Sequence, residues 1–90
     1  DIVARVVVLE PVKKVKKKMV AAMQSFNKVE YEVKYGKKVS ADKSKGVKTK
    51  RVSTNSLTLK LKPGKYQLIY RVWAGSSATQ WSPVASFKVK

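Results

Sequence analysis

Ninety residues are enough for one domain, and the apolar share of 43% predicts a packed core. The chain has no Cys and no His, which excludes disulfides, thiolate zinc sites and the commonest general base of enzymes. Twenty-one Lys and Arg face five Asp and Glu, and the resulting net charge of +16 predicts association with polyanions.

The first quarter of the chain combines a clear strand with an ambiguous segment. Residues 2–9 are mostly β-branched and predict a strand that Glu10 and Pro11 end. In residues 12–26, apolar side chains recur at helical spacing with lysines on the other face, but several of them also share one face of a strand. An amphipathic helix and a strand both stay open for this segment.

The rest of the chain alternates apolar and polar residues, which is typical of half-buried strands. We expect strands at 29–35, 47–52, 57–61, 66–72 and 84–89, with turn residues between them. The charged sequence of 47–52 suits the edge of a sheet, where Lys discourages aggregation. Short strands at this spacing predict an all-β sandwich or barrel.

The second half of the chain resembles a fibronectin type III domain. The stretch 57–66, Leu-Thr-Leu-Lys-Leu-Lys-Pro-Gly-Lys-Tyr, is similar to that family's strand E, its Leu-x-Pro-Gly turn and its strand-F tyrosine. Residues 66–74 match its alternating strand F, 81–87 are similar to the start of its strand G, and 29–35 are similar to its strand C.

This resemblance implies one domain over residues 1–90, a single antiparallel β-sandwich of about seven strands and of immunoglobulin-like type. The chain departs from the family in two places: the turn before Tyr66 is one residue shorter, and the tryptophan expected on strand B is missing. The length of the first third fits an A–B–C order of strands, which favours a strand B at 16–24. An α+β fold with a helix at 12–26 is the alternative.

The acidic residues do not predict a catalytic site. Glu30 and Glu32 share one strand face and could serve as a carboxylate pair, but we interpret them as solvent-facing residues paired with neighbouring Lys. The four glycines are scattered, so the sequence contains no phosphate-binding loop. We expect a protein that is not an enzyme and that uses no cofactor and no metal.

Lysines gather at one end of the expected sandwich. In the fibronectin-like order, the A–B, C–C′ and E–F loops lie at one end together with the C-terminus. We expect binding of a polyanion or an acidic partner by Lys13, Lys14, Lys16, Lys17, Lys18, Lys37, Lys38, Lys43, Lys45, Lys62 and Lys65, with Lys90 beside them. Since an ammonium group is a hydrated point charge, this attraction should not depend on the sequence of the partner.

The opposite end of the expected sandwich is nearly uncharged and rich in Ser, Asn and Thr. Its loops cover 24–27, 53–56 and 75–81, and such residues make good contacts as well as ordinary loops. A second binding surface there is a hypothesis, with candidate contact residues Asn55, Ser76, Ser77, Gln80 and Trp81.

The aromatic residues argue against nucleic acid as the first choice of partner. Single-strand binding needs aromatic platforms beside the positive charge. We expect the tyrosines to lie on the core side of their strands, Trp73 to face outward and Trp81 to lie beside the neutral loops. The aromatics are not interleaved with the lysines in the sequence. A basic nucleic-acid-associated domain is therefore the alternative function.

The sequence thus predicts a structural or adhesive binding module whose lysine-rich pole docks on an acidic protein surface or an anionic polymer. We expect it at a cell surface or virion surface, or secreted, among protein neighbours of a larger assembly. No apolar run approaches the roughly 20 residues of a membrane span. The chain begins at Asp1 and not at Met, which we interpret as a processed product or a piece of a longer protein.

Overall fold

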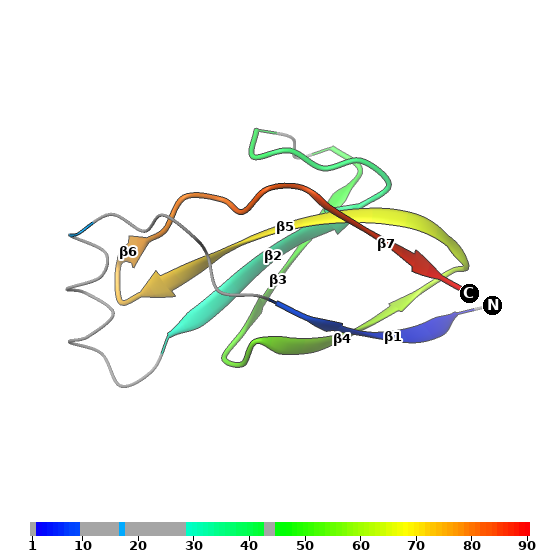
Figure 1. Ribbon diagram of the computed structural model, residues 1–90, viewed down its shortest axis with the longest axis horizontal. Coiled ribbons are helices and arrows are strands. Elements are labelled where there is room, and N and C mark those ends of the chain that lie inside the picture. Colours follow the sequence, from blue (N-terminus) through cyan, green and yellow to red (C-terminus); the bar gives the residue numbers. More distant parts are fainter. Residues whose placement is uncertain (1, 10–16, 18–28, 43–44) are drawn as a thin grey trace.

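The computed structural model describes residues 2–9, 17, 29–42 and 45–90 (Figure 1). Its elements are all β-strands, and apart from Lys17, which has a helical backbone, the described residues therefore confirm an essentially all-β fold. The prediction of a helix or a strand B within 12–26 concerns residues that, apart from Lys17, lie outside the described part. No helix among the described residues is long and apolar enough to cross a membrane. The strands are β1 (Val3–Val8), β2 (Glu30–Gly36), β3 (Val47–Val52), β4 (Ser56–Leu61), β5 (Gly64–Ala74), β6 (Ser77–Ala78) and β7 (Ala85–Val89).

The described strands form two antiparallel sheets. β1 and β4 make the smaller sheet, and β3, β2 and β5 follow one another in the larger one. β7 pairs with the first residues of β5, whereas β6 pairs with its last two residues. Among the described strands β3 pairs only with β2 and so lies at the edge of the larger sheet, as its charged sequence predicts.

One apolar core joins the two sheets. Its buried cluster consists of Leu9, Val33, Leu57, Leu59, Leu68 and Tyr70, which come from both sheets and from the residue after β1. Within each strand these residues occupy alternate positions, because successive side chains of a strand point to opposite faces. Val33 and Leu59 are at most 2% exposed. Burying one such side chain contributes about 1.5–3 kcal/mol to stability.

The register of the strands defines the two ends of the molecule. Val3 pairs with Leu61, and Gly64 pairs with Val89, so the start of β1 and the end of β7 lie beside the β4–β5 turn (Figure 1). At the opposite end the N–H group of Leu9 donates to the carbonyl of Asn55 at 2.7 Å. Glu30 pairs there with Trp73.

The direction of β1 differs from the expected arrangement. The fibronectin-like order places the loop after the first strand at the same end as the β4–β5 turn. β1 instead pairs directly and antiparallel with β4, so the chain leaves β1 next to Asn55, at the opposite end. The reason is physical: the β-branched sequence of β1 suits any strand position, and only pairing decides which neighbour it takes.

The loop after β2 returns over the outer face of the larger sheet. Val39 is 5% exposed, and its N–H group donates to Oε1 of Gln67 at 3.1 Å. The ammonium group of Lys34 donates to the carbonyl of Ala41 at 2.8 Å. This part of the loop is therefore packed against the sheet, and Lys37 lies close to Gly64 at the start of β5.

Two hydroxyl groups attach the segment between β6 and β7 to β5. Thr79 receives the N–H group of Val72 on its Oγ1 at 3.0 Å and donates its own N–H group to the Val72 carbonyl at 2.9 Å. Ser82 makes the same pair of bonds with Tyr70, at 3.0 and 2.8 Å. Both side chains are buried. Their hydrogen bonds satisfy the β5 backbone groups along the segment that connects β6 to β7, where no regular strand pairs with β5.

Candidate functional site

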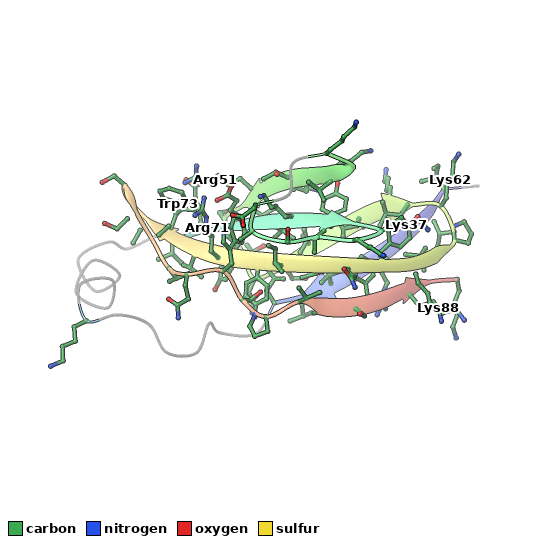
Figure 2. All side chains as sticks on the ribbon, turned by 90° about the horizontal axis from the view of Figure 1, so that it is seen from above. Lys37, Arg51, Lys62, Arg71, Trp73 and Lys88 are labelled. Carbon is green, nitrogen blue, oxygen red and sulfur yellow. The ribbon has the colours of Figure 1, made fainter. Side chains whose placement is uncertain are left out.

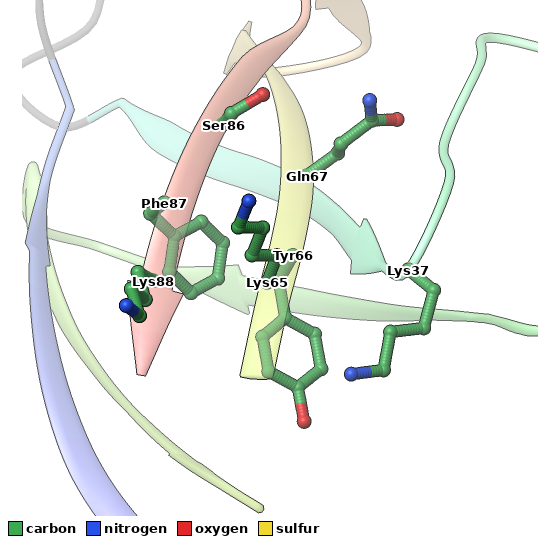
Figure 3. A pocket seen from close by; sticks show the side chains of 7 residues that line it. All are labelled: Lys37, Lys65, Tyr66, Gln67, Ser86, Phe87 and Lys88. Carbon is green, nitrogen blue, oxygen red and sulfur yellow. The ribbon is translucent and has the colours of Figure 1, made fainter. Parts of the chain in front are cut away.

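A shallow pocket with three lysines lies where β5 and β7 meet (Figure 3). Its volume is about 540 Å³. One lysine comes from the loop after β2, and the other two come from facing strands. The lining residues are Lys37, Lys65, Tyr66, Gln67, Ser86, Phe87 and Lys88.

An aromatic pair forms the apolar part of this pocket. Tyr66 and Phe87 are opposite each other in the β5–β7 register, and their rings stack with centroids 5.7 Å apart at 22°. The ammonium group of Lys37 lies 4.1 Å from the Tyr66 ring centroid, which is a cation–π contact. The Tyr66 hydroxyl donates to the carbonyl of Lys62 at 2.6 Å and so holds the ring against the β4–β5 turn.

The charges of the pocket are all of one sign. Lys65 and Lys88 are direct partners in the β5–β7 register, and like charges in such cross-strand positions repel each other. The lining includes no carboxylate. The two ion pairs among the described residues lie elsewhere and use Arg51 and Arg71. The positive potential of the pocket is thus not neutralised by the part of the chain that the structure describes.

The neutral polar groups of the pocket add hydrogen-bond donors. Oε1 of Gln67 accepts the Val39 N–H group, and this leaves the Gln67 side-chain NH₂ group as a donor. Ser86 is exposed and contributes a hydroxyl group, which can donate. Gln67 and Ser86 are cross-strand partners on the same face as Lys65 and Lys88, whereas Tyr66 and Phe87 occupy the alternate positions of the two strands.

Several of the lysines predicted to bind lie at this end of the molecule. Figure 2 shows Lys37, Lys62 and Lys88 at one end and the Arg51–Arg71–Trp73 cluster away from them. Lys38, Lys65 and Lys90 are exposed and lie next to residues that the register places at this end. We call these six residues the lysine-rich end: Lys37, Lys38, Lys62, Lys65, Lys88 and Lys90.

The remaining predicted lysines are placed differently or not described. Lys45 is exposed in the turn before β3, and Lys17 is exposed. Lys13, Lys14, Lys16, Lys18 and Lys43 lie outside the described residues. Lys88 was missed by the sequence interpretation, because its charge matters through its partner Lys65, and nothing local in the sequence gives the β5–β7 register.

A second charged cluster covers the outer face of the larger sheet, and its glutamates pair with its arginines. Oε1 of Glu32 accepts hydrogen bonds from Nε of Arg71 and from Nε1 of Trp73, both at 2.7 Å. Arg51 pairs with Glu30 at 3.1 Å. The carboxylates are thus paired with Arg, and the expectation that their partners are Lys is wrong. The partners come from β3 and β5, which are distant in sequence.

The electrostatics of this cluster favour ionised Glu32. Partial burial alone would raise the pKa of Glu32, but the hydrogen bonds from Trp73 and Arg71 and the charges of Arg71 and Arg51 outweigh it. The pKa of Glu32 therefore lies below its ordinary value of 4.5.

Cations and aromatic rings alternate on the same outer face. The Arg71 guanidinium lies 4.9 Å from the Trp73 ring centroid and 4.3 Å from that of Trp81. Arg51 lies over Trp73 at 4.7 Å, and the Lys34 ammonium lies over Trp81 at 5.3 Å. The aromatics are not interleaved with the lysines in the sequence, but the fold brings Lys34 over Trp81 and Lys37 over Tyr66. Trp73 does face outward, as its phase predicts.

The candidate contact residues of the neutral end do not converge on one surface. Asn55, Ser76 and Gln80 are exposed, and Ser77 is half-buried in β6. Trp81 stacks on Arg71 over the larger sheet, whereas the Asn55 carbonyl binds Leu9 of the smaller one. Among the described residues, the lysine-lined pocket is therefore a better candidate for a binding site than the neutral end.

Comparison of the chain with known protein families, with curated proteins and with solved structures found no match.

Proposed function

We propose that this chain is a non-catalytic binding module that docks through its lysine-rich end on an acidic partner surface. The setting would be a cell-surface, secreted or virion assembly, as the composition predicts. The single observation that carries the proposal is the pocket formed by Lys37, Lys65 and Lys88 without a carboxylate in its lining. Concentrated like charge repels itself, and an anionic partner removes that repulsion.

We further propose a fibronectin type III-like sandwich as the scaffold. The support is the bond from the Tyr66 hydroxyl to the carbonyl four residues upstream, at the corner between β4 and β5. Such a tyrosine corner is a hallmark of immunoglobulin-like sandwiches. Two packed sheets with a shared core are consistent with it. The direct pairing of β1 with β4 departs from the expected strand order.

Single-stranded nucleic acid is the second candidate, because cations lie against Tyr66 and Trp81. A stacking platform needs an open ring face, however, and Tyr66 is 8% exposed with Lys37 over its ring. The rings at Trp73 and Trp81 are already stacked against Arg71. These contacts favour the acidic-surface proposal.

Salt titrations with two polyanions test the proposed function. Binding of heparin and of duplex DNA would be measured between about 50 and 200 mM NaCl, where exposed charge contacts are increasingly screened. We expect both polymers to bind and to dissociate together as salt rises. DNA binding that alone survives the higher salt would replace this proposal with the nucleic-acid function.

A matched pair of variants locates the docking surface. Lys62→Gln combined with Lys65→Gln removes two charges from the lysine-rich end. Lys48→Gln combined with Lys50→Gln removes two charges from β3, at the opposite edge of the larger sheet. We expect the first variant to reduce the salt slope for duplex DNA by about two and to weaken heparin more than the second does. Equal losses would place the docking surface elsewhere.

A further inference from the structure

The hydrogen bond that follows β1 fixes which of its backbone groups pair with β4. The N–H group of Leu9 donates to the carbonyl of Asn55, and this bond continues the register of the two strands. In an antiparallel pair, directly opposite residues alternate between hydrogen-bonded and non-hydrogen-bonded pairs. The odd-numbered residues of β1 therefore bond to β4, and the N–H and C=O groups of Ala4, Val6 and Val8 point the other way.

A contact of β4 agrees with this assignment. Thr58 lies opposite Val6, and its carbonyl accepts the ammonium group of Lys50 from β3 at 3.2 Å. The Thr58 carbonyl thus points away from β1, as expected in a non-hydrogen-bonded pair. A side chain of β3 therefore bonds to the free edge of β4, whereas no described strand pairs with the free edge of β1.

The same residues of β1 carry exposed apolar side chains. The odd-numbered Val7 and Leu9 pack in the core, so the even-numbered positions face outward. Val6 is 57% exposed and Val8 is 66% exposed, and Ile2, just before the strand, is 61% exposed. The free edge of β1 thus combines a row of backbone donors and acceptors with a row of apolar side chains.

The sequence of β1 does little to prevent strand pairing. Edge strands usually carry Lys, Pro or a bulge, which discourage pairing with another chain. Half of the residues of β3 are Lys or Arg, whereas Arg5 is the single charge of β1, which pairs with β4 in an unbroken register. Such an edge is suited to β-augmentation, in which an extended peptide adds a strand to an existing sheet.

Charge decides which kind of strand fits this edge. Arg5 is exposed, and neither ion pair of the described residues uses it. A second copy of the chain would bring another Arg5 and another net charge of +16 to the edge. Like charges on neighbouring strands repel each other, whereas opposite charges attract. The edge therefore favours a strand with Asp or Glu at the position beside Arg5.

We propose that the free edge of β1 binds an extended segment of an acidic partner protein, which adds a strand to the smaller sheet. Main-chain bonds to the even-numbered residues of β1 hold the segment, its apolar side chains lie beside Val6 and Val8, and a carboxylate meets Arg5. The inference goes beyond the proposed function, because it uses a surface other than the lysine-rich end.

Amide hydrogen exchange of the ¹⁵N-labelled protein tests the proposal without a substitution. The probe is the synthetic peptide Thr-Val-Glu-Val-Glu-Val-Thr with blocked ends. Without the peptide, the amides of Arg5 and Val7 should be protected, and those of Val6 and Val8 should exchange faster. At about ten times the dissociation constant of the peptide, exchange at Val6 and Val8 should slow about tenfold, because it occurs only from the unbound protein.

Modified peptides separate strand pairing from charge. When the valines of the peptide lie beside those of β1, the valine N–H groups face β1 and the glutamate N–H groups face away. N-methylation of two valines should therefore abolish the slowing, and N-methylation of the two glutamates should preserve it. Equal binding of the two methylated peptides, or no slowing by the unmodified one, would overturn the proposal.

Protection of Val6 and Val8 in the protein without peptide would also contradict it. Protection that grows with protein concentration would identify a second copy as the neighbour of β1. Protection independent of concentration would assign the edge to a segment of the same chain outside the described part.

Two substitutions in β1 test the bonds and the charge separately. Val6→Pro removes an N–H group that faces the free edge and none that bonds to β4, an orientation in which edge strands tolerate Pro. We expect a folded HSQC spectrum and peptide binding about fivefold weaker or more. Arg5→Gln should weaken the peptide about twofold to fivefold, the usual effect of an exposed charge pair.

The matched control for the charge is Lys60→Gln, which removes one cation from β4 opposite Ala4. It should weaken the peptide less than about twofold, because Lys60 lies one strand away from the added segment. If Arg5→Gln and Lys60→Gln bind the peptide equally well, the acidic partner is wrong. The Arg5→Gln comparison stands even where Val6→Pro does not fold.

Discussion

Glu32 has more described partners than the other acidic residue of β2. One of its oxygens accepts bonds from Arg71 and Trp73, and its side chain is 18% exposed. Glu30 differs, since its side chain is 56% exposed and its partner Arg51 is 48% exposed. Exposed pairs contribute about 0–1 kcal/mol, whereas partly buried hydrogen bonds to a charge contribute more.

We expect Glu32→Gln to lower the free energy of unfolding by about 1–2 kcal/mol at pH 7. Because the folded pKa of Glu32 is lowered, its ionisation stabilises the protein fully above about pH 4.5, the ordinary value. This stabilisation is lost as the pH falls through the lower folded pKa. The difference between wild type and variant should therefore shrink below about pH 4.5.

Urea denaturation at pH 7, 5, 4 and 3 measures this difference. Glu30→Gln is the matched control on the same strand face, and we expect it to change stability by less than about 0.5 kcal/mol. Equal effects of the two variants, or a constant difference across the acid range, would contradict the role assigned to the Glu32 cluster.

At the scale of elements, the segment from β6 to β7 depends on two side-chain hydroxyls instead of a continuous ladder. Thr79 and Ser82 each accept a β5 N–H group, and each hydroxyl donates to a carbonyl of the following residue, at 3.0 and 3.2 Å. Sequence reasoning proposed contact roles for neighbouring residues of this loop and overlooked these two. Nothing local marks a buried hydroxyl in a Ser- and Thr-rich segment.

Replacing Thr79 by Val keeps the shape of the side chain but leaves the Val72 N–H group without its acceptor. We expect a loss of about 1–3 kcal/mol, the typical penalty for an unsatisfied buried donor. Thermal unfolding measures it, with Thr58→Val as the control, since Thr58 is exposed on β4 and its substitution should be nearly neutral. Similar losses in both variants would show that the Thr79 hydroxyl is not the anchor.

For the whole molecule, the balance of charge sets the conditions under which the fold is stable. The net charge is +16, and the described carboxylate pairs relieve only the outer face of the larger sheet. The described part of the chain shows no carboxylate paired with the lysine-rich end, so the repulsion between its lysines remains. Repulsion between exposed charges is screened beyond about 8–10 Å at physiological salt, so stability should depend on ionic strength.

We expect the melting temperature to rise as NaCl increases from about 10 to 200 mM. For a chain of this size, screening worth about 1 kcal/mol corresponds to a rise of about 4–8 °C. Differential scanning calorimetry at pH 7 measures it. The Lys65→Gln, Lys88→Gln double variant should show a higher melting temperature at low salt and a smaller rise. A melting temperature that does not respond to salt would mean that self-repulsion is unimportant for this fold.

Local pattern determined most of the strands of this protein. Alternation of apolar and polar residues predicted β3 at 47–52 and located β4 and β5 to within about two residues at each end, because a strand's faces follow directly from its period of two. The same pattern assigned Trp73 to the outer face and the tyrosines of β5 to the core. The strong positive charge of the molecule follows from its composition without any knowledge of the fold.

Tertiary structure decided which strands and charges are neighbours. The period of a strand gives the face of each side chain, but register and partner are set by long-range packing. Only the folded chain therefore shows that β1 lies against β4 and that Glu32 meets Arg71. It alone places Lys88 opposite Lys65, since residues 23 apart in sequence become neighbours only when β5 and β7 pair.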